Sequence, residues 1–480
     1  MSSLPEEHSA QRASRLHRLR ELGHHEWLSP DQWRRRILFW TGAIVVGLSA
    51  VFFAKAADFA FGIFHGMASH GWWVPFLITP PTFALLCWLT QGALKATRGS
   101  GIPQAIAALK VEDEGFRTNL LALKVALGKM ALTLAALLGG ASVGREGPTV
   151  HVGAGLLYSM GRRFGFDDPT AAGRFILAGS AAGLAAAFNT PLAGVVFAIE
   201  EMSGTFEHRM SGTLLTAVIV AGVVSLGIVG NYAYFGDVTA TLPLGRAWIA
   251  VLLTGITGGV AGGLFARLII PSATGLRGSM ARLRGRQPIV FAAACGLALV
   301  LLSLLSANGL YGTGYAQARD ILQGHGDTGP LFGVLKFLGN IASAWAGIPG
   351  GIFSPALAVG AGLGGNIASL LPGADTSAVV LLGMAAYLSG VTQAPLTAAV
   401  ISLELTANHM MALPIMAACL LARAVSGLVC RVPVYKALAD VLIVQYEVER
   451  ARREPPVSAD DATPGAPPPA APPASMEPAA

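Results

Sequence analysis

Apolar residues are concentrated in long stretches between positions 37 and 430 of the chain. The clearest stretches span residues 37–54, 75–94, 213–231, 248–270, 289–306 and 412–430. A helix that crosses a bilayer needs about 20 mainly apolar residues, and these stretches are close to that length. The pattern therefore predicts an all-α integral membrane protein that crosses the bilayer many times.

Other apolar stretches are interrupted by glycine and proline, as in residues 131–160 and 345–372. Irregular backbone at membrane depth is tolerated only where it is buried in protein or lines a cavity. Helices that stop inside the membrane are typical of transporters, in which half-helix ends face the bound ions. We therefore expect some helices of this chain to end at a protein-lined ion site.

The composition excludes a soluble protein of this size. Of the 480 residues, 53% are hydrophobic and 12% are charged, whereas soluble domains carry about 25% charged residues. The net charge is +6, but lysine and arginine also accumulate in the cytoplasmic loops of membrane proteins. A lipid bilayer is therefore the expected surrounding, and the basic balance does not indicate a nucleic-acid partner.

The two ends of the chain are polar. Residues 1–36 are rich in arginine and precede the first apolar stretch, so they do not have the form of a cleaved signal peptide. Together with a basic loop at 277–286, they are expected in the cytoplasm. Residues 447–480 become rich in proline and alanine and predict a disordered cytoplasmic tail. This leaves residues 37–446 as the transmembrane domain.

Two pairs of segments indicate an internal repeat. Residues 144–156 align with 351–363 at an offset of 207, with seven of thirteen positions identical. Residues 175–200 align with 379–404 at an offset of 204, and both segments share a Pro-Leu pair and a terminal glutamate. Duplicated halves with broken helices are typical of transporters. The predicted halves are about 37–235 and 245–446, and the repeat alone leaves their relative orientation open.

Three glycine-proline motifs have the form of helix starts. They are Gly99–Pro103 (GSGIP), Gly144–Pro148 (GREGP) and Gly351–Pro355 (GIFSP). Proline is favoured in the first turn of a helix, and glycine lets a ligand approach the backbone closely. The unpaired N–H groups of a helix start bind an anion without a full positive charge. Such a site would hold an anion weakly enough to release it.

Two hydroxyl groups are candidate anion ligands beside these motifs. Ser100 lies inside the first motif, and Tyr435 lies in the late segment Arg431–Tyr435. The alternative for Ser100 is a helix N-cap, and the alternative for Tyr435 is an aromatic residue at the membrane interface.

Ionisable residues within apolar sequence are candidates for function because their burial is costly. Glu146 lies at a helix start, where its carboxylate would compete with an anion for the same amides and leave when protonated. Alternatively, it pairs with Arg145 or caps the helix. Glu201, at the end of an apolar run, could receive protons from the cytoplasm, or it simply ends a helix at the interface. Lys129 either pairs with a carboxylate or has a structural role.

The remaining candidates favour structural roles. Glu404 occupies the position equivalent to Glu200 in the repeat, and we expect it to cap or pair structurally. His151 is expected to be packed and hydrogen-bonded. The cysteines are expected to be buried free thiols; they are Cys87, Cys295, Cys419 and Cys430. No spacing predicts a metal site or a cofactor, and no common catalytic motif is present, so an enzyme is not indicated.

The motifs GSGIP, GREGP and GGIFSP, the segment AAAFNTPLAGVVFAIEEM and the late Tyr435 together resemble the CLC family of chloride channels and chloride/proton antiporters. The resemblance extends from about residue 35 to 446 and is to bacterial members without regulatory C-terminal domains. It implies a fold of two inverted repeats with many tilted and broken helices. It also implies a homodimer with a separate pore in each subunit, in the bacterial inner membrane with both termini cytoplasmic.

The resemblance also implies the roles of individual residues. The chloride-binding residues would be Ser100, Tyr435, Ile352 and Phe353 at a central site, and Arg145 and Gly147, with the amide of Glu146, at an outer site. Glu146 would be the gating glutamate. Glu201 would be the internal proton-transfer glutamate, with Glu200 nearby on the same pathway.

The two acids at 200 and 201 decide between the activities found in this family. Channels of the family usually lack an acid at the position of Glu201, so the sequence favours chloride/proton exchange. The alternatives are a passive chloride channel and a membrane scaffold or receptor that transports nothing. Ser100 favours chloride, because nitrate-preferring relatives carry proline there. His151 departs from the family, in which glutamine is common at this position.

Overall fold

The computed structural model describes residues 30–453 apart from 93, 204–210, 231–232, 244, 246–247, 275–277, 307–308 and 326–327. The arginine-rich residues 1–29, Arg277 of the predicted basic loop and residues 454–480 of the predicted tail lie outside the described residues.

The described chain is helical throughout. The helices of the first half are α2 (Pro30–Ala68), α3 (Val74–Leu89), α4 (Ile102–Lys110), α5 (Glu114–Leu121), α6 (Leu123–Leu138), α7 (Glu146–Arg163), α8 (Pro169–Phe188), α9 (Pro191–Phe197), a π-helix (Ala198–Ser203) and α10 (Ser211–Val229). Those of the second half are α11 (Ile249–Thr274), α12 (Gly278–Arg286), α13 (Pro288–Leu305), α14 (Tyr315–Gln323), α15 (Phe332–Trp345), α16 (Phe353–Ser369), α17 (Thr376–Thr392), α18 (Pro395–Thr406), α19 (Ala412–Val429) and α20 (Val434–Arg453). Short 3₁₀ turns lie at Lys95–Thr97 and His409–Met411. The predicted all-α class is confirmed.

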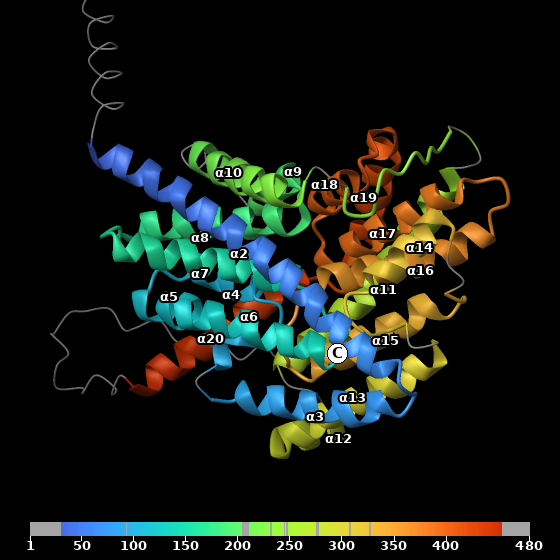
Figure 1. The fold of residues 1–480 in the computed structure, drawn as a ribbon, viewed down its shortest axis with the longest axis horizontal. Helices are drawn as coiled ribbons and strands as arrows, with labels where there is room; N and C mark the ends of the chain where they lie inside the picture. Colours follow the sequence, from blue (N-terminus) through green and yellow to red (C-terminus); the bar gives the residue numbers. More distant parts are fainter. Residues whose placement is uncertain are drawn as a thin grey trace, which may run out of the picture.

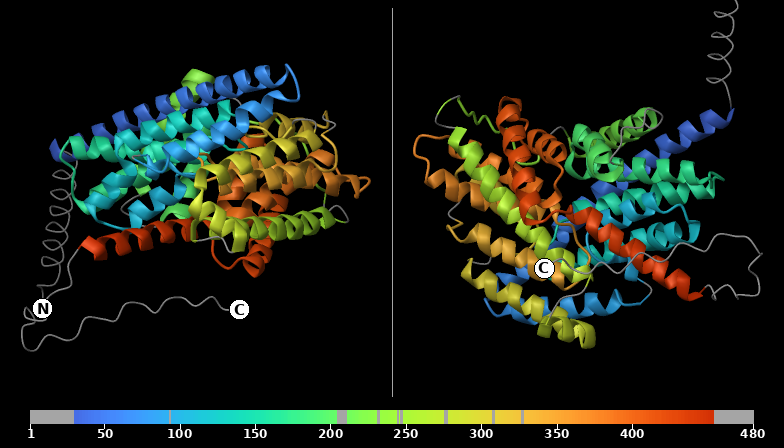
Figure 2. Two further views of the ribbon diagram at one scale, coloured as in Figure 1. Left: turned by 90° about the horizontal axis from the view of Figure 1, so that it is seen from below. Right: turned by 180° about the vertical axis from the view of Figure 1, so that it is seen from behind.

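Each of the six clear apolar stretches forms a helix, in α2, α3, α10, α11, α13 and α19. Among the described residues, six helices are long and apolar enough to cross a membrane. The helices are tilted relative to one another, and α2 runs diagonally past α6, α7 and α8 (Figure 1). Figure 2 shows α2 along one face of the molecule and α20 along the opposite face.

The boundaries of three polar segments differ from the prediction. Helix α2 begins at Pro30, so the basic run Arg34–Arg36 lies in its first turns and not in a separate segment. The predicted basic loop is largely the short helix α12. Helix α20 continues to Arg453, beyond the predicted end of the transmembrane domain at 446. Its polar side chains pair with the rest of the protein, as between Asp440 and Lys110 at 2.6 Å.

The two halves have the same order of packing. In the first, α7 packs on α8 and α8 on α10; in the second, α16 packs on α17 and α17 on α19. The α7–α8 and α16–α17 crossings are close because a glycine of one helix meets a glycine of the other. A Cβ atom on Gly153 would lie 2.2 Å from the carbonyl oxygen of Gly179, and one on Gly360 would lie 2.6 Å from that of Gly383. In the predicted repeat, Gly153 corresponds to Gly360 and Gly179 corresponds to Gly383.

Reciprocal contacts join the two halves. The Glu404 carboxylate accepts hydrogen bonds from the amides at the start of α9, at 3.1 Å from Leu192 and 2.7 Å from Ala193. The Glu200 carboxylate accepts them from the start of α18, at 3.2 Å from Leu396 and 2.7 Å from Thr397. Equivalent residues thus contact each other's half, as in an interface with two-fold symmetry. The capping role predicted for Glu404 is confirmed.

We predict that Gly179→Ala destabilises the protein by about 1–3 kcal/mol, because the new methyl group overpacks the α7–α8 crossing. Thermal unfolding of the detergent-solubilised protein measures the change. The matched control is Gly173→Ala on the same helix, where an added Cβ meets no atom within 4 Å. Equal melting temperatures for the two variants would contradict the proposed role of the glycine crossing.

Candidate ion-transport site

The three glycine-proline motifs converge, as predicted, at the starts of α4, α7 and α16. Gly144 and Gly351 exchange two backbone hydrogen bonds of 2.7 Å, and the Gly350 amide donates to the Gly99 carbonyl at 3.1 Å. A Cβ on Gly147 would lie 2.2 Å from the Ser100 hydroxyl oxygen. Only glycine lets the backbone of α7 approach the first motif this closely. The free N–H groups of the helix starts are therefore gathered in one region.

A buried lysine fixes the loop before α4. The Lys129 ammonium donates to the carbonyls of Thr97 at 2.6 Å and Gly99 at 2.8 Å. Gly99 and Gly101 have left-handed backbone angles, with φ values of 63° and 104°, and glycine adopts these without strain. Because the bonds of Lys129 go to backbone carbonyls, the structure favours the structural alternative for this residue.

Ser100 and Tyr435 come together beneath the start of α16. Both side chains are buried and border the same cavity, and neither hydroxyl has a hydrogen-bond partner among the described residues. The Tyr435 ring stacks on Phe353, the first residue of α16, with centroids 5.9 Å apart. Ile352 precedes Phe353 as the N-cap residue. The two hydroxyls therefore lie at the same end of the protein interior as the start of α16.

A cavity of about 240 Å³ reaches this point from the side of α12 and α20. Its lining includes Ser100, Ile352 and Tyr435 at the inner end and the basic side chains of Arg98 and Arg284. A cavity with basic residues in its low-dielectric wall raises the local concentration of anions.

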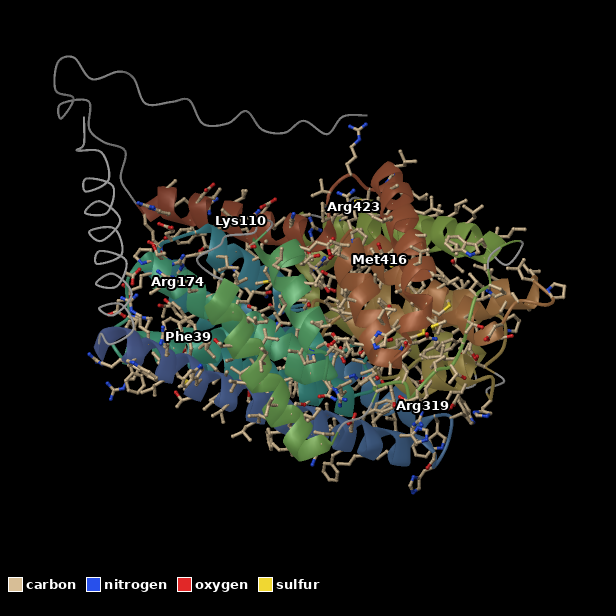
Figure 3. The ribbon with its side chains drawn as sticks, turned by 90° about the horizontal axis from the view of Figure 1, so that it is seen from above. Phe39, Lys110, Arg174, Arg319, Met416 and Arg423 are labelled. Atoms are coloured by element: carbon tan, nitrogen blue, oxygen red, sulfur yellow. The ribbon has the colours of Figure 1, made fainter. Side chains whose placement is uncertain are left out.

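Figure 3 shows Lys110 and Arg423 toward the face that carries α20, and Arg319 toward the opposite face.

Glu146 occupies the start of α7. Its side chain is fully buried; one carboxylate oxygen accepts a 2.6 Å hydrogen bond from the Ser354 hydroxyl, and the other has no partner. Arg145 instead directs its guanidinium to α2, where it bonds to the Ala54 carbonyl and the Asp58 carboxylate, both at 2.6 Å. The alternative of a Glu146–Arg145 ion pair is therefore not supported. The carboxylate lies where helix-start amides attract an anion.

The two adjacent acids have different surroundings. Glu201 lies in the π-helix, is 3% exposed, and borders a cavity of about 760 Å³ whose lining also includes Arg174 and Lys436. Single-turn π-helices are frequent at functional sites. The Glu200 carboxylate is engaged in capping α18. Its place on a proton pathway therefore stays a prediction.

His151 is packed and hydrogen-bonded, as predicted. It is fully buried on α7, one ring nitrogen contacts the Leu120 carbonyl at 2.8 Å, and its Cβ lies directly against Gly101. The four cysteines are free thiols; three are buried and Cys430 is partly exposed.

The sequence does not mark Ser354 and Asp58 as neighbours of the site. Ser354 lies within the third motif, but no pattern distinguishes it from the adjacent residues. Asp58 is remote in sequence from Arg145 and Glu146, and no local motif marks it.

Comparison with known proteins identifies the family. Residues 82–427 match the family described as voltage gated chloride channel. The H(+)/Cl(−) exchange transporter ClcA of Yersinia pestis is 31% identical over 372 residues, which cover 74% of each chain. The ClcA of Cronobacter sakazakii is 30% identical over 429 residues, covering 85% of this chain and 89% of the relative. This chain belongs to the CLC family.

Solved CLC structures share the fold. A slow cyanobacterial Cl⁻/H⁺ antiporter has a TM-score of 0.74 and 26% identity, over 87% of this chain and all of that one. A CLC-type fluoride/proton antiporter has a TM-score of 0.70 and 23% identity, over 85% of this chain and 98% of that one, and shows the fold alone. The CLC-like transmembrane fold predicted from the sequence is therefore confirmed.

We predict that Ser100→Ala weakens chloride binding by about ten-fold or more, because a hydrogen bond to a charged group contributes roughly 1.5–3 kcal/mol. Isothermal titration calorimetry of the purified protein with chloride measures it. Tyr387→Phe is the control, since it removes another buried, unpartnered hydroxyl in α17. Unchanged affinity in Ser100→Ala would remove Ser100 from the anion site.

Proposed function

We propose that this protein exchanges chloride for protons across a membrane, with Glu146 as the protonatable gate. The observation that carries the proposal is the buried carboxylate of Glu146 at the start of α7, in the position favoured for an anion. The ClcA relatives, named as H(+)/Cl(−) exchange transporters, support the same reading.

Exchange follows from competition for one set of amides. The ionised Glu146 carboxylate accepts a hydrogen bond from the Ser354 hydroxyl, and in this proposal the positive end of the α7 dipole attracts it. A protonated carboxyl has no charge to hold it against the amides, so it leaves and a chloride ion takes its place. When the chloride moves on, the group returns after releasing its proton. Each passage of the gate therefore couples a proton to the movement of chloride.

The chloride route runs through the cavity beside α12 and α20 to Ser100 and Tyr435, and then to the amides around Arg145, Glu146 and Gly147. The anion is held by hydroxyls and peptide dipoles, without a lysine or arginine in direct contact. Partial charges favour binding that remains reversible. In this proposal, Arg98 and Arg284 attract chloride to the entrance.

The proton route would start at Glu201, which borders the larger cavity. In this proposal, the proton passes from Glu201 toward Glu146 near the central site. Glu200, which caps α18, is the remaining acid that the family resemblance puts on this pathway.

The membrane setting follows from the distribution of basic residues. The region around the smaller cavity is basic, and it includes Lys95, Arg98, α12 and the basic end of α20. The positive-inside rule favours the cytoplasmic side of the membrane for such a basic region. We therefore propose the bacterial inner membrane, with both termini cytoplasmic. The family resemblance further suggests a homodimer, with a separate pore in each subunit because all the proposed site residues come from one chain.

We predict that purified protein in liposomes moves protons uphill when a chloride gradient is imposed. Glu146→Ala should abolish proton movement and leave chloride flux, because alanine frees the amides permanently and carries no proton. Paired chloride-electrode and pH-electrode recordings measure both ions. Wild-type chloride flux without proton movement would instead favour a passive channel, which the family description also covers. Flux equal to that of empty liposomes would favour a non-transporting scaffold.

We predict that Glu201→Gln abolishes proton movement but keeps chloride flux, since glutamine carries no transferable proton and the change leaves every proposed anion ligand intact. The adjacent Glu200→Gln is the matched comparison. It should lower the unfolding free energy by about 1 kcal/mol, because the α18 cap is weakened. A normal proton-to-chloride ratio in Glu201→Gln would exclude Glu201 from the pathway. A reduced ratio in folded Glu200→Gln would add Glu200 to it.

A further inference from the structure

Helix α15 carries a polar face within the transmembrane domain. Lys336, Asn340 and Ser343 are all buried there, and their spacing of four and three residues places them on one side of the helix. Polar side chains of membrane helices find partners on neighbouring segments. The Lys336 ammonium donates to the carbonyls of Leu310 and Gly312, at 2.8 and 2.9 Å. Asn340 and Ser343 instead line the cavity of about 240 Å³ that reaches Ser100 and Tyr435.

Asn340 joins the loop before α7 to the first turn of α16. Its side-chain oxygen accepts a 2.8 Å hydrogen bond from the Ser142 hydroxyl, and its side-chain nitrogen donates to the Pro355 carbonyl at 3.1 Å. Ser142 lies two residues before Gly144 of the second motif, and Pro355 ends the third motif. The Ser142 amide in turn donates to the Ser343 hydroxyl oxygen at 3.1 Å. One side chain thus bridges the segments that carry two of the helix starts.

The partners of Asn340 fix the orientation of its carboxamide. The Pro355 carbonyl can only accept, so the amide nitrogen faces α16, and the amide oxygen is left to accept from the Ser142 hydroxyl. Ser142 and Asn340 are 3% and 4% exposed. A polar group that is so buried loses free energy of stabilisation when its partner is removed. The bridge through Asn340 therefore holds the first turn of α16 against the loop before α7.

The bridge has no counterpart in the first half among the described residues. When the offset of 207 is extended back along the repeat, α15 aligns with α6; Lys336 then corresponds to Lys129, Asn340 to Thr133 and Ser343 to Ala136. The two lysines act alike, since each donates to backbone carbonyls of a loop. The Thr133 hydroxyl is buried without a hydrogen-bond partner in the described part of the chain, and it does not line the cavity. The bridge is thus a feature of the half that borders the cavity.

We propose that Asn340 is a positioning residue, which keeps the amides of Ile352 and Phe353 at the inner end of the cavity by fixing the first turn of α16. Asn340 is not itself a ligand of chloride in this proposal. A set of donors that is already in place binds an ion without the entropic cost of ordering. Release of the α16 start should therefore weaken chloride binding although every ligand is retained. The inference rests on the proposed function, because it assigns a residue that prepares the chloride site.

The test is Asn340→Ala, with isothermal titration calorimetry of chloride on the folded, detergent-solubilised protein. The Kd for chloride should rise roughly two- to ten-fold, since the loss in affinity is limited by the free energy of the hydrogen bond that is removed. Thr133→Ala is the matched control, because it removes a buried polar group at the equivalent position of α6, and it should leave the Kd unchanged. A wild-type Kd in folded Asn340→Ala, or an equal rise in Thr133→Ala, would overturn the inference.

A double-mutant cycle separates positioning from a general loss of stability. Ser142→Ala removes the hydroxyl that orients the carboxamide, so it should also raise the Kd. Adding it to Asn340→Ala should change the Kd little further, because the bridge is already broken. Independent effects of the two substitutions on the Kd would contradict a shared bridge.

Chloride flux into liposomes gives a second measurement. In Asn340→Ala, the chloride concentration for half-maximal flux should rise by a factor similar to that of the Kd. Maximal flux should be retained, because all the proposed ligands and both acids remain. A reduced maximal flux with an unchanged half-maximal concentration would count against a role in preparing the chloride site.

Ser142→Ala applies even where Asn340→Ala does not fold, and a wild-type Kd in folded Ser142→Ala would overturn the inference. If wild-type protein binds and moves chloride while Asn340→Ala matches Thr133→Ala, only this inference fails. If wild-type protein neither binds nor moves chloride, the proposed function itself fails.

Discussion

The peptide N–H groups at the starts of α4, α7 and α16 have no partners within their own helices, and they are gathered in the interior of the protein. Unpaired donors of this kind favour an acceptor beside them. In the proposed function that acceptor is an anion or the carboxylate of Glu146, which is buried at one of these starts and bonded to the Ser354 hydroxyl. Two features make this arrangement of helix starts possible. Glycines let the helix starts approach one another, and the ammonium of Lys129 fixes the loop before α4.

The convergence depends on the relation between the two halves. The antiparallel contact of Gly144 with Gly351 and the reciprocal caps of Glu200 and Glu404 connect equivalent points of the repeat. The proposed site draws on both halves, since Ser100 comes from the first half and Phe353 and Tyr435 come from the second. In this proposal, the packing of the two halves forms the ion site at their junction, with different side chains on its two sides.

The two acids have different surroundings. Glu146 is fully buried at the start of α7, where the Ser354 hydroxyl donates to it, whereas Glu201 borders a cavity. In the proposed exchange, Glu146 competes with chloride and Glu201 supplies the protons. The proposal thus gives one acid to the gate and the other to the proton entrance.

The sequence by itself determined the membrane class, the all-α fold, the repeat and the three helix starts, because hydrophobic length and glycine-proline spacing are local properties of the chain. It did not determine where α2 begins or where α20 ends, since polar helical ends depend on pairing with distant residues, such as that of Glu449 in α20 with Lys95. Only the tertiary structure decided that Arg145 pairs with Asp58 and that Glu200 caps α18. The physical reason is that these contacts join residues distant in sequence, and no local pattern encodes which distant group will satisfy a buried charge or donor.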